Sequence, residues 1–136
     1  MSDALSAAEA AIAAARAAPL SARRAMLAAL TLDAAADALA AGGDVLALRA
    51  ELAEKSEALR LVFALCAMRP DGPRLVTEAV AVPLGDYGTL SLEDFMVSLY
   101  NSHSVQRVRI ADGEARSDVH AVLAEGLQFL HRHPRG

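Results

Sequence analysis

Residues 44–68 read DVLALRAELAEKSEALRLVFALCAM, the clearest hydrophobic pattern in the chain. Its seam positions recur at alternating steps of three and four residues, the heptad spacing of helices that pack along a shared seam. The pattern predicts one helix from Asp44, its N-cap, to about Met68. The seam consists of Val45, Leu48, Leu52, Lys55, Leu59, Val62 and Cys66. We expect the residues from Val45 to Val62 to form an interface, either within one chain or between two.

Lys55 is the one polar residue on this seam. A lone polar side chain on such a seam fixes helix register or partner number. Alternatively, its aliphatic stem lies along the edge of the seam while the ammonium group stays in water. The sequence leaves both interpretations open.

Two alanine-rich helices are predicted before the seam. Of the 32 alanines, 22 lie in the first 50 residues, so these helices present small faces that allow close packing. The first spans Ser2 to Ala17, and Pro19 ends it. Ser21 caps the second through Leu30, with a continuation to Ala41 after a possible break at 31–33. The face of the first helix is Leu5, Ala8, Ile12 and Ala15. The three helices predict an antiparallel bundle.

The segment 69–73, RPDGP, consists mostly of residue types that favour turns. It separates this helical part, residues 1–68, from a mixed part, residues 74–132. The mixed part predicts a strand over 74–82, a helix over 92–100, a strand over 104–110 and a final helix that ends near His131. We therefore expect a single α+β domain over 1–136 that is mostly helical. Two strands make a marginal sheet, so the missing strands come from a second copy or the bundle covers the sheet. We favour a homodimer.

Composition excludes several classes of protein. The net charge of −4 is spread evenly, which does not match the clustered basic face of a nucleic-acid-binding protein. No apolar run is long enough to cross a membrane, and the acids Asp3 and Glu9 do not suit an export signal. A single cysteine, Cys66, predicts a buried thiol and fits the reducing cytoplasm. We expect no metal, because His131 and His133 have no suitably spaced further ligands, and no cofactor.

Three clusters of residues are candidates for binding. Asp86 and Tyr87 lie between two glycines in a loop that could bind a ligand or partner. Alternatively, the loop is only a tight connection between two elements. After the predicted helix, the segment Asn101 to Ser104 brings together hydrogen-bonding groups around His103, although Asn and Ser are also common at helix ends. Tyr100 could line a pocket together with Tyr87, His103 and Arg107 or Arg109. Arg107 and Arg109 share one strand face and could hold a carboxylate or phosphate, or simply solvate that face. We name no catalytic residue.

The strongest pattern in the chain is a packing pattern, and residues suited to catalysis are few. The leading hypothesis is therefore a non-enzymatic cytoplasmic protein that acts by association, through a homodimer, a docked partner, or both. The alternative is a small-molecule-binding protein or small enzyme with a pocket between the helical and mixed parts. A DNA-binding regulator is the least favoured, because the chain is acidic.

Overall fold

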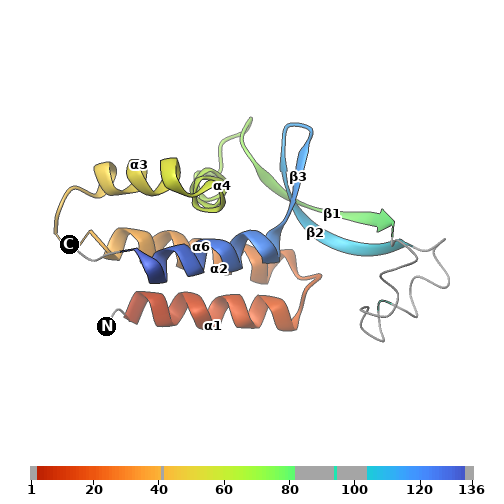
Figure 1. The fold of residues 1–136 in the computed structure, drawn as a ribbon. Coiled ribbons are helices and arrows are strands. Elements are labelled where there is room, and N and C mark those ends of the chain that lie inside the picture. The colour runs from red at the N-terminus through yellow and green to blue at the C-terminus, as the bar shows by residue number, and fades with distance from the viewer. Residues whose placement is uncertain (1–2, 41, 82–93, 95–103, 134–136) are drawn as a thin grey trace.

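The computed structural model describes residues 3–40, 42–81, 94 and 104–133. Within these ranges the fold is α+β and mostly helical, as predicted (Figure 1). The elements are α1 (Asp3–Ala17), α2 (Ala22–Ala38), α3 (Val45–Lys55), α4 (Glu57–Cys66), β1 (Arg74–Ala81), β2 (Ser104–Asp112), β3 (Ala115–Asp118) and α6 (Val119–Arg132). No helix in the described ranges has the length and apolar content to cross a membrane.

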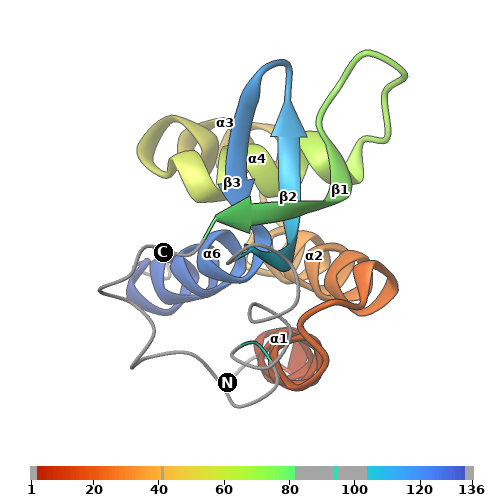
Figure 2. The ribbon, with the colours of Figure 1, turned by 90° about the vertical axis from the view of Figure 1, so that its right-hand side faces the viewer.

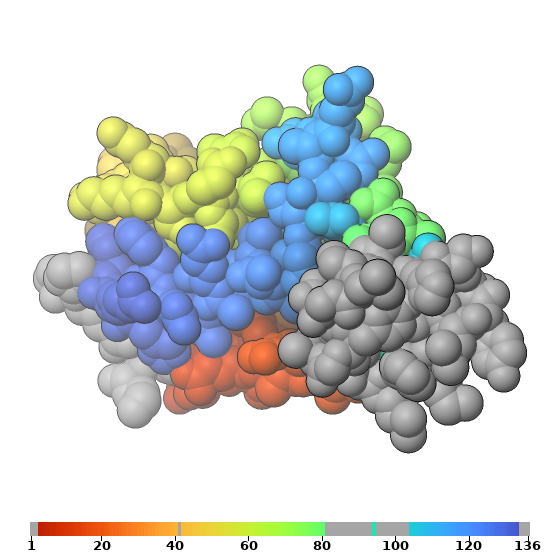
Figure 3. Space-filling view, turned by 45° about the vertical axis from the view of Figure 1, so that its right-hand side comes forward, coloured from red at the N-terminus to blue at the C-terminus, as the bar shows by residue number. Residues whose placement is uncertain are grey.

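The helices form layers, and the sheet lies at one end of them. In Figure 1, α1 lies below α2 and α6, while α3 lies above them. Figure 3 shows the exposed side of α6 between α1 and the α3–α4 segment. The inner side of α6 contacts α1, α2 and α4, and its Gly126 has no side chain where Leu32 and Leu59 approach. The C-terminal helix is therefore part of the bundle that the sequence had assigned to the first three helices.

The alanine-rich helices pack as their sequence predicts. Leu5, Ala8, Ile12 and Ala15 are all buried on α1, and α2 buries six small or aliphatic side chains against them and the core. The possible break at 31–33 does not occur, because α2 is continuous from Ala22 to Ala38. The Thr31 hydroxyl donates to the carbonyls of Leu27 and Ala28 at 3.1 and 2.9 Å, so it is satisfied inside the helix.

The single helix predicted from Asp44 to Met68 is wrong. Asp44 caps α3 as expected, with its side chain accepting from the Ala47 N–H. Ser56 then takes an extended conformation, φ −134° and ψ 111°, and caps a second helix by accepting from the Leu59 N–H. Figure 1 shows α3 from the side and α4 end-on. The heptad seam therefore does not continue along one helix.

The sheet has three antiparallel strands in the order β1-β2-β3. The prediction that 112–113 leads directly into the final helix is wrong, because the chain first forms a hairpin to β3. Gly113, at φ +60°, is the first of the two turn residues, where type II′ hairpin turns take glycine. The third strand thus comes from the same chain, which removes the argument that a second copy must complete the sheet. The helix predicted over 92–100 lies outside the described residues.

Candidate functional site

Five predicted binding residues lie outside the described residues: Asp86, Tyr87, Tyr100, Asn101 and His103. The other two, Arg107 and Arg109, lie on one face of β2, opposite the buried side chains of Val108 and Ile110. This alternation confirms the predicted half-exposed strand.

Carboxylates already pair with both arginines. Arg107 lies 3.0 Å from Asp94, whereas Arg109 lies 3.7 Å from Glu78, which Arg116 also approaches at 3.4 Å. An external anion would have to displace these partners. The buried Nε of Arg109 has no hydrogen-bond partner within the part of the chain that the structure describes.

The predicted interface residues divide between the core and the surface. Leu52, Leu59 and Val62 are fully buried inside one chain, and Leu48 is half-buried. Val45 is at the surface, and Lys55 is exposed with its ammonium group 3.1 Å from Glu51. Packing within the chain is therefore sufficient to account for the apolar residues at the centre of the pattern.

The Cys66 thiol is half-buried beside these residues. Burial and, to a lesser extent, the negative charge of Asp33 raise its pKa, the Arg49 charge opposes both effects, and the result is a pKa of about 12. A thiol with such a pKa is almost entirely protonated at neutral pH and is a poor nucleophile. This agrees with the expected structural role.

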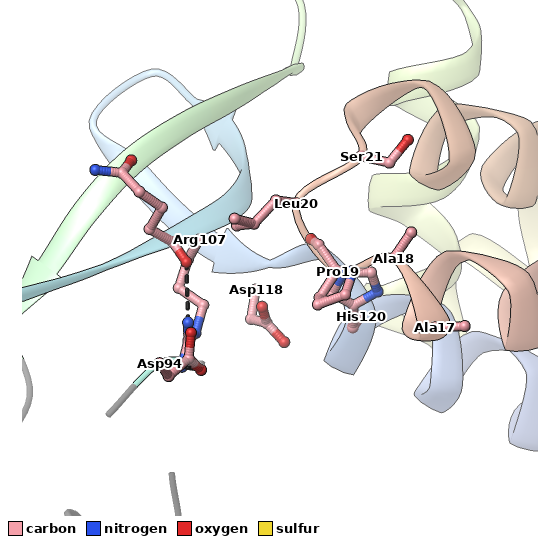
Figure 4. Close-up of a pocket in the computed structure, with 10 residues that line it drawn as sticks. Ala17, Ala18, Pro19, Leu20, Ser21, Asp94, Arg107, Asp118 and His120 are labelled. Carbon is pink, nitrogen blue, oxygen red and sulfur yellow. Dashed lines mark hydrogen bonds and ion pairs between the residues drawn. The ribbon is translucent and has the colours of Figure 1, made fainter. Parts of the chain in front are cut away.

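A cavity of about 540 Å³ opens between the helical part and the mixed part. The turn from α1 to α2 forms one wall, and Gln106, Arg107, Asp118 and His120 contribute from the mixed part, together with Asp94 (Figure 4). In Figure 4, Leu20 and Asp118 lie between the Arg107–Asp94 ion pair and His120.

The polar groups of this cavity also hold the fold. Asp118 caps α6 by accepting from the Ala121 N–H at 3.0 Å. His120 donates from Nε2 to the Pro19 carbonyl at 3.0 Å, so it ties α6 to the α1–α2 turn. Its Nδ1 is buried and unpartnered among the described residues. The arrangement can orient a small ligand, but among the described lining residues no nucleophile is hydrogen-bonded to a base.

A second surface lies along the outer side of α2. We call it the α2 groove, and it consists of two hollows of about 840 and 510 Å³ that share Arg23 and Met26. The other lining residues are Ser21, Arg24, Leu27 and Leu30 in the first, and Ala22, Leu65, Met68, Arg69, Pro73, Arg74 and Leu75 in the second. Figure 2 shows α2 on the same side of the molecule as the connection from α4 to β1.

Large apolar side chains are exposed in this groove. Leu27 is 57% exposed, Leu30 39% and Met68 63%. Met68 follows α4 with φ 53°, a left-handed conformation that is unfavourable for a side chain with a Cβ. The exposed stripe of α2 is opposite its buried alanine face, so both faces of the helix are apolar.

Four arginines surround the groove, and all are exposed: Arg23, Arg24, Arg69 and Arg74. Within the described ranges none of the four has a carboxylate partner. Of the other described arginines, Arg49, Arg60, Arg107, Arg109 and Arg116 have one, whereas Arg16 and Arg132 do not. No acidic residue among the described ones lines either hollow.

Sequence reasoning missed this groove. The available signal was Arg23, Leu27 and Leu30 at positions i, i+4 and i+7, which share one helix face. In the described ranges, no group of three or more His, Cys, Asp or Glu residues could hold a metal ion. Comparison with protein-family models, with curated proteins and with solved structures finds no match to this chain.

Proposed function

We propose that this chain acts by binding another protein through the α2 groove. The exposed apolar side chains of Leu27, Leu30 and Met68, in two hollows that share Arg23 and Met26, carry the proposal. Exposed apolar surface with a polar rim is typical of interaction sites, because its burial on binding is favourable. The proposal keeps the expectation of a non-enzymatic, cytoplasmic protein.

The homodimer expected from the sequence stays a prediction. An isologous contact through the α2 groove would place the four groove arginines opposite their copies. Repulsion between like charges disfavours that contact, so we assign the groove to a different protein.

Photo-crosslinking tests the proposal in the cell that makes the protein. A benzophenone amino acid replaces Leu27 or Met68 in turn, and it replaces Arg132, at the end of α6, in a control. We expect discrete adducts from the two groove positions and none from position 132. An adduct of twice the chain mass would identify a second copy instead. Equal crosslinking from all three positions, or none from the groove, would contradict the proposal.

We propose small-molecule binding at the 540 Å³ cavity as a second candidate function. Its position between the helical and mixed parts, with Arg107 in its wall, supports this alternative. Pockets of roughly this size take small ligands. A thermal-shift screen of small polar compounds should give hits that the cavity-filling variant Leu20→Trp abolishes. Leu20 is 49% exposed, so this substitution should leave the fold intact. Hits that persist in the variant would place binding elsewhere.

A further inference from the structure

We infer that the partner presents an acidic amphipathic helix to the α2 groove. This inference rests on the proposed function and specifies the chemistry of its partner. Its basis is that four arginines without a carboxylate partner gather at one groove, whereas five of the seven other described arginines are paired with carboxylates.

The apolar part of the groove sets the shape of the partner. Leu27 and Leu30 of α2 line the first hollow, and Met68, just after α4, lines the second. An amphipathic helix places apolar side chains at i, i+3, i+4 and i+7, and it inserts them into a groove between two elements. The two hollows provide successive places for such side chains.

The rim of the groove sets the charge of the partner. Guanidinium groups form strong, often bidentate hydrogen bonds with carboxylates, and these bonds supply specificity beyond apolar burial. In the second hollow, Arg23 lies on the α2 side, while Arg69 and Arg74 come from the segment that joins α4 to β1 and from the start of β1. Arg24 lines the first hollow. Asp and Glu on both flanks of a bound helix would therefore meet arginines on both sides.

A second copy of this chain is a less suitable occupant. Its α3 carries the most exposed of the large apolar side chains that the structure describes, Leu46 at 81%, and on the same helix are the acidic residues Glu51 and Glu54. Docking that helix into a neighbour's groove is a head-to-tail contact, which produces open chains unless the rotation closes a ring. Light scattering across a concentration series would detect such growth.

The test uses two designed helical peptides of about 18 residues, long enough to form several turns. Both have the same leucine stripe, but one has glutamates on its flanks and the other has lysines. Fluorescence anisotropy measures their binding to the full chain. We expect the acidic peptide to bind at least tenfold more tightly, and its affinity to fall as salt is added.

Substitutions locate the binding. Arg23→Glu should reduce or reverse the preference for the acidic peptide, and Leu27→Ser should weaken both peptides roughly tenfold. Arg132→Glu makes the same charge change on α6 and should leave binding unchanged. Thermal denaturation of each variant confirms that it remains folded.

Three outcomes would overturn the inference. Equal binding of both peptides, or no binding of either, would remove the acidic helix as partner, although crosslinking from the groove could still support the proposed function. Binding to vesicles with 30% phosphatidylserine, about the content of an anionic membrane surface, without binding to the acidic peptide would assign the groove to a lipid surface.

Discussion

Met68 has an unusual backbone for its residue type. It is the non-glycine residue with positive φ in the described ranges, and its side chain is mostly exposed. Glycine at this position after a helix has no Cβ penalty. We predict that Met68→Gly raises the free energy of unfolding by about 1 kcal/mol in urea denaturation. Gly42→Ala is the reciprocal control. Gly42 has φ +87°, so adding a Cβ there should lower the free energy of unfolding by a similar amount.

A loss of stability in Met68→Gly would show that the methionine side chain contributes more to the fold than its exposure indicates. In that case the side chain could not be treated as available to a partner.

Cys66 should be protected from alkylation in the folded protein. Since burial raises its pKa to about 12, we predict iodoacetamide modification at pH 8 roughly a thousandfold slower than for an unfolded cysteine. The same pKa shift makes the stability of the fold depend on pH. Because the folded state binds the thiol proton more strongly than the unfolded state does, the shift stabilises the fold below the unfolded pKa near 9, and this stabilisation is lost as pH rises.

Mass spectrometry of the alkylated protein, with and without urea, measures the difference in rate. A Cys66→Ser variant shows how the free energy of unfolding depends on pH without the thiol. Between pH 9 and 11 its stability should fall less than that of the wild type. Rapid alkylation without denaturant would contradict the assignment of a buried thiol.

Among the elements, α3 is attached to the rest of the molecule by its buried Leu52 and by Arg49. Its guanidinium lies 2.6 Å from Asp33 and 2.8 Å from Asp37 on α2, and 4.1 Å from the centre of the Phe63 ring on α4. Burial alone would lower the pKa of Arg49, but the hydrogen bonds and charges of the two aspartates together raise it. Arg49 therefore remains charged and joins three helices.

We predict that Arg49→Met destabilises the protein by about 2 kcal/mol, because it leaves two carboxylates without their cation. Lys55→Met is the matched control on the same helix. It breaks an exposed pair, and we expect little change. Urea denaturation followed by circular dichroism measures both. Equal losses in the two variants would contradict a special role for Arg49.

The break at Ser56 shows the limit of periodicity as evidence for a helix. Leu52, Leu59 and Val62 keep the same spacing on both sides of the break, and all three are buried. The periodicity therefore predicts burial correctly but does not reveal that one extended residue redirects the chain. The local signal was serine as an N-cap, with Glu57 in the following first turn.

For the whole molecule, the sequence predicted the fold class and the buried face of α1 better than the candidate site. Buried faces follow from residue spacing within one element. The α2 groove combines residues from α2, the end of α4 and the start of β1, so it depends on tertiary packing. The unpaired arginines are recognisable only once the positions of the carboxylates are known.

The packing of Leu52 and Leu59 decides between an internal core and an interface between chains. Both are fully buried within the single chain. Each Leu→Ala substitution at such a site costs about 2–5 kcal/mol, so the double variant loses most of the 5–15 kcal/mol of a typical domain. We therefore predict that the double variant unfolds rather than dissociates into folded monomers, and that its Tm does not depend on protein concentration.

Circular dichroism and light scattering on the same samples distinguish these results, and Leu46→Ala, at an exposed position on α3, should change neither. Folded monomers released from a larger wild-type assembly would show that the seam lies between chains. Unfolding at every concentration would assign the seam to the internal core, and the α2 groove would remain the proposed binding surface of the folded chain.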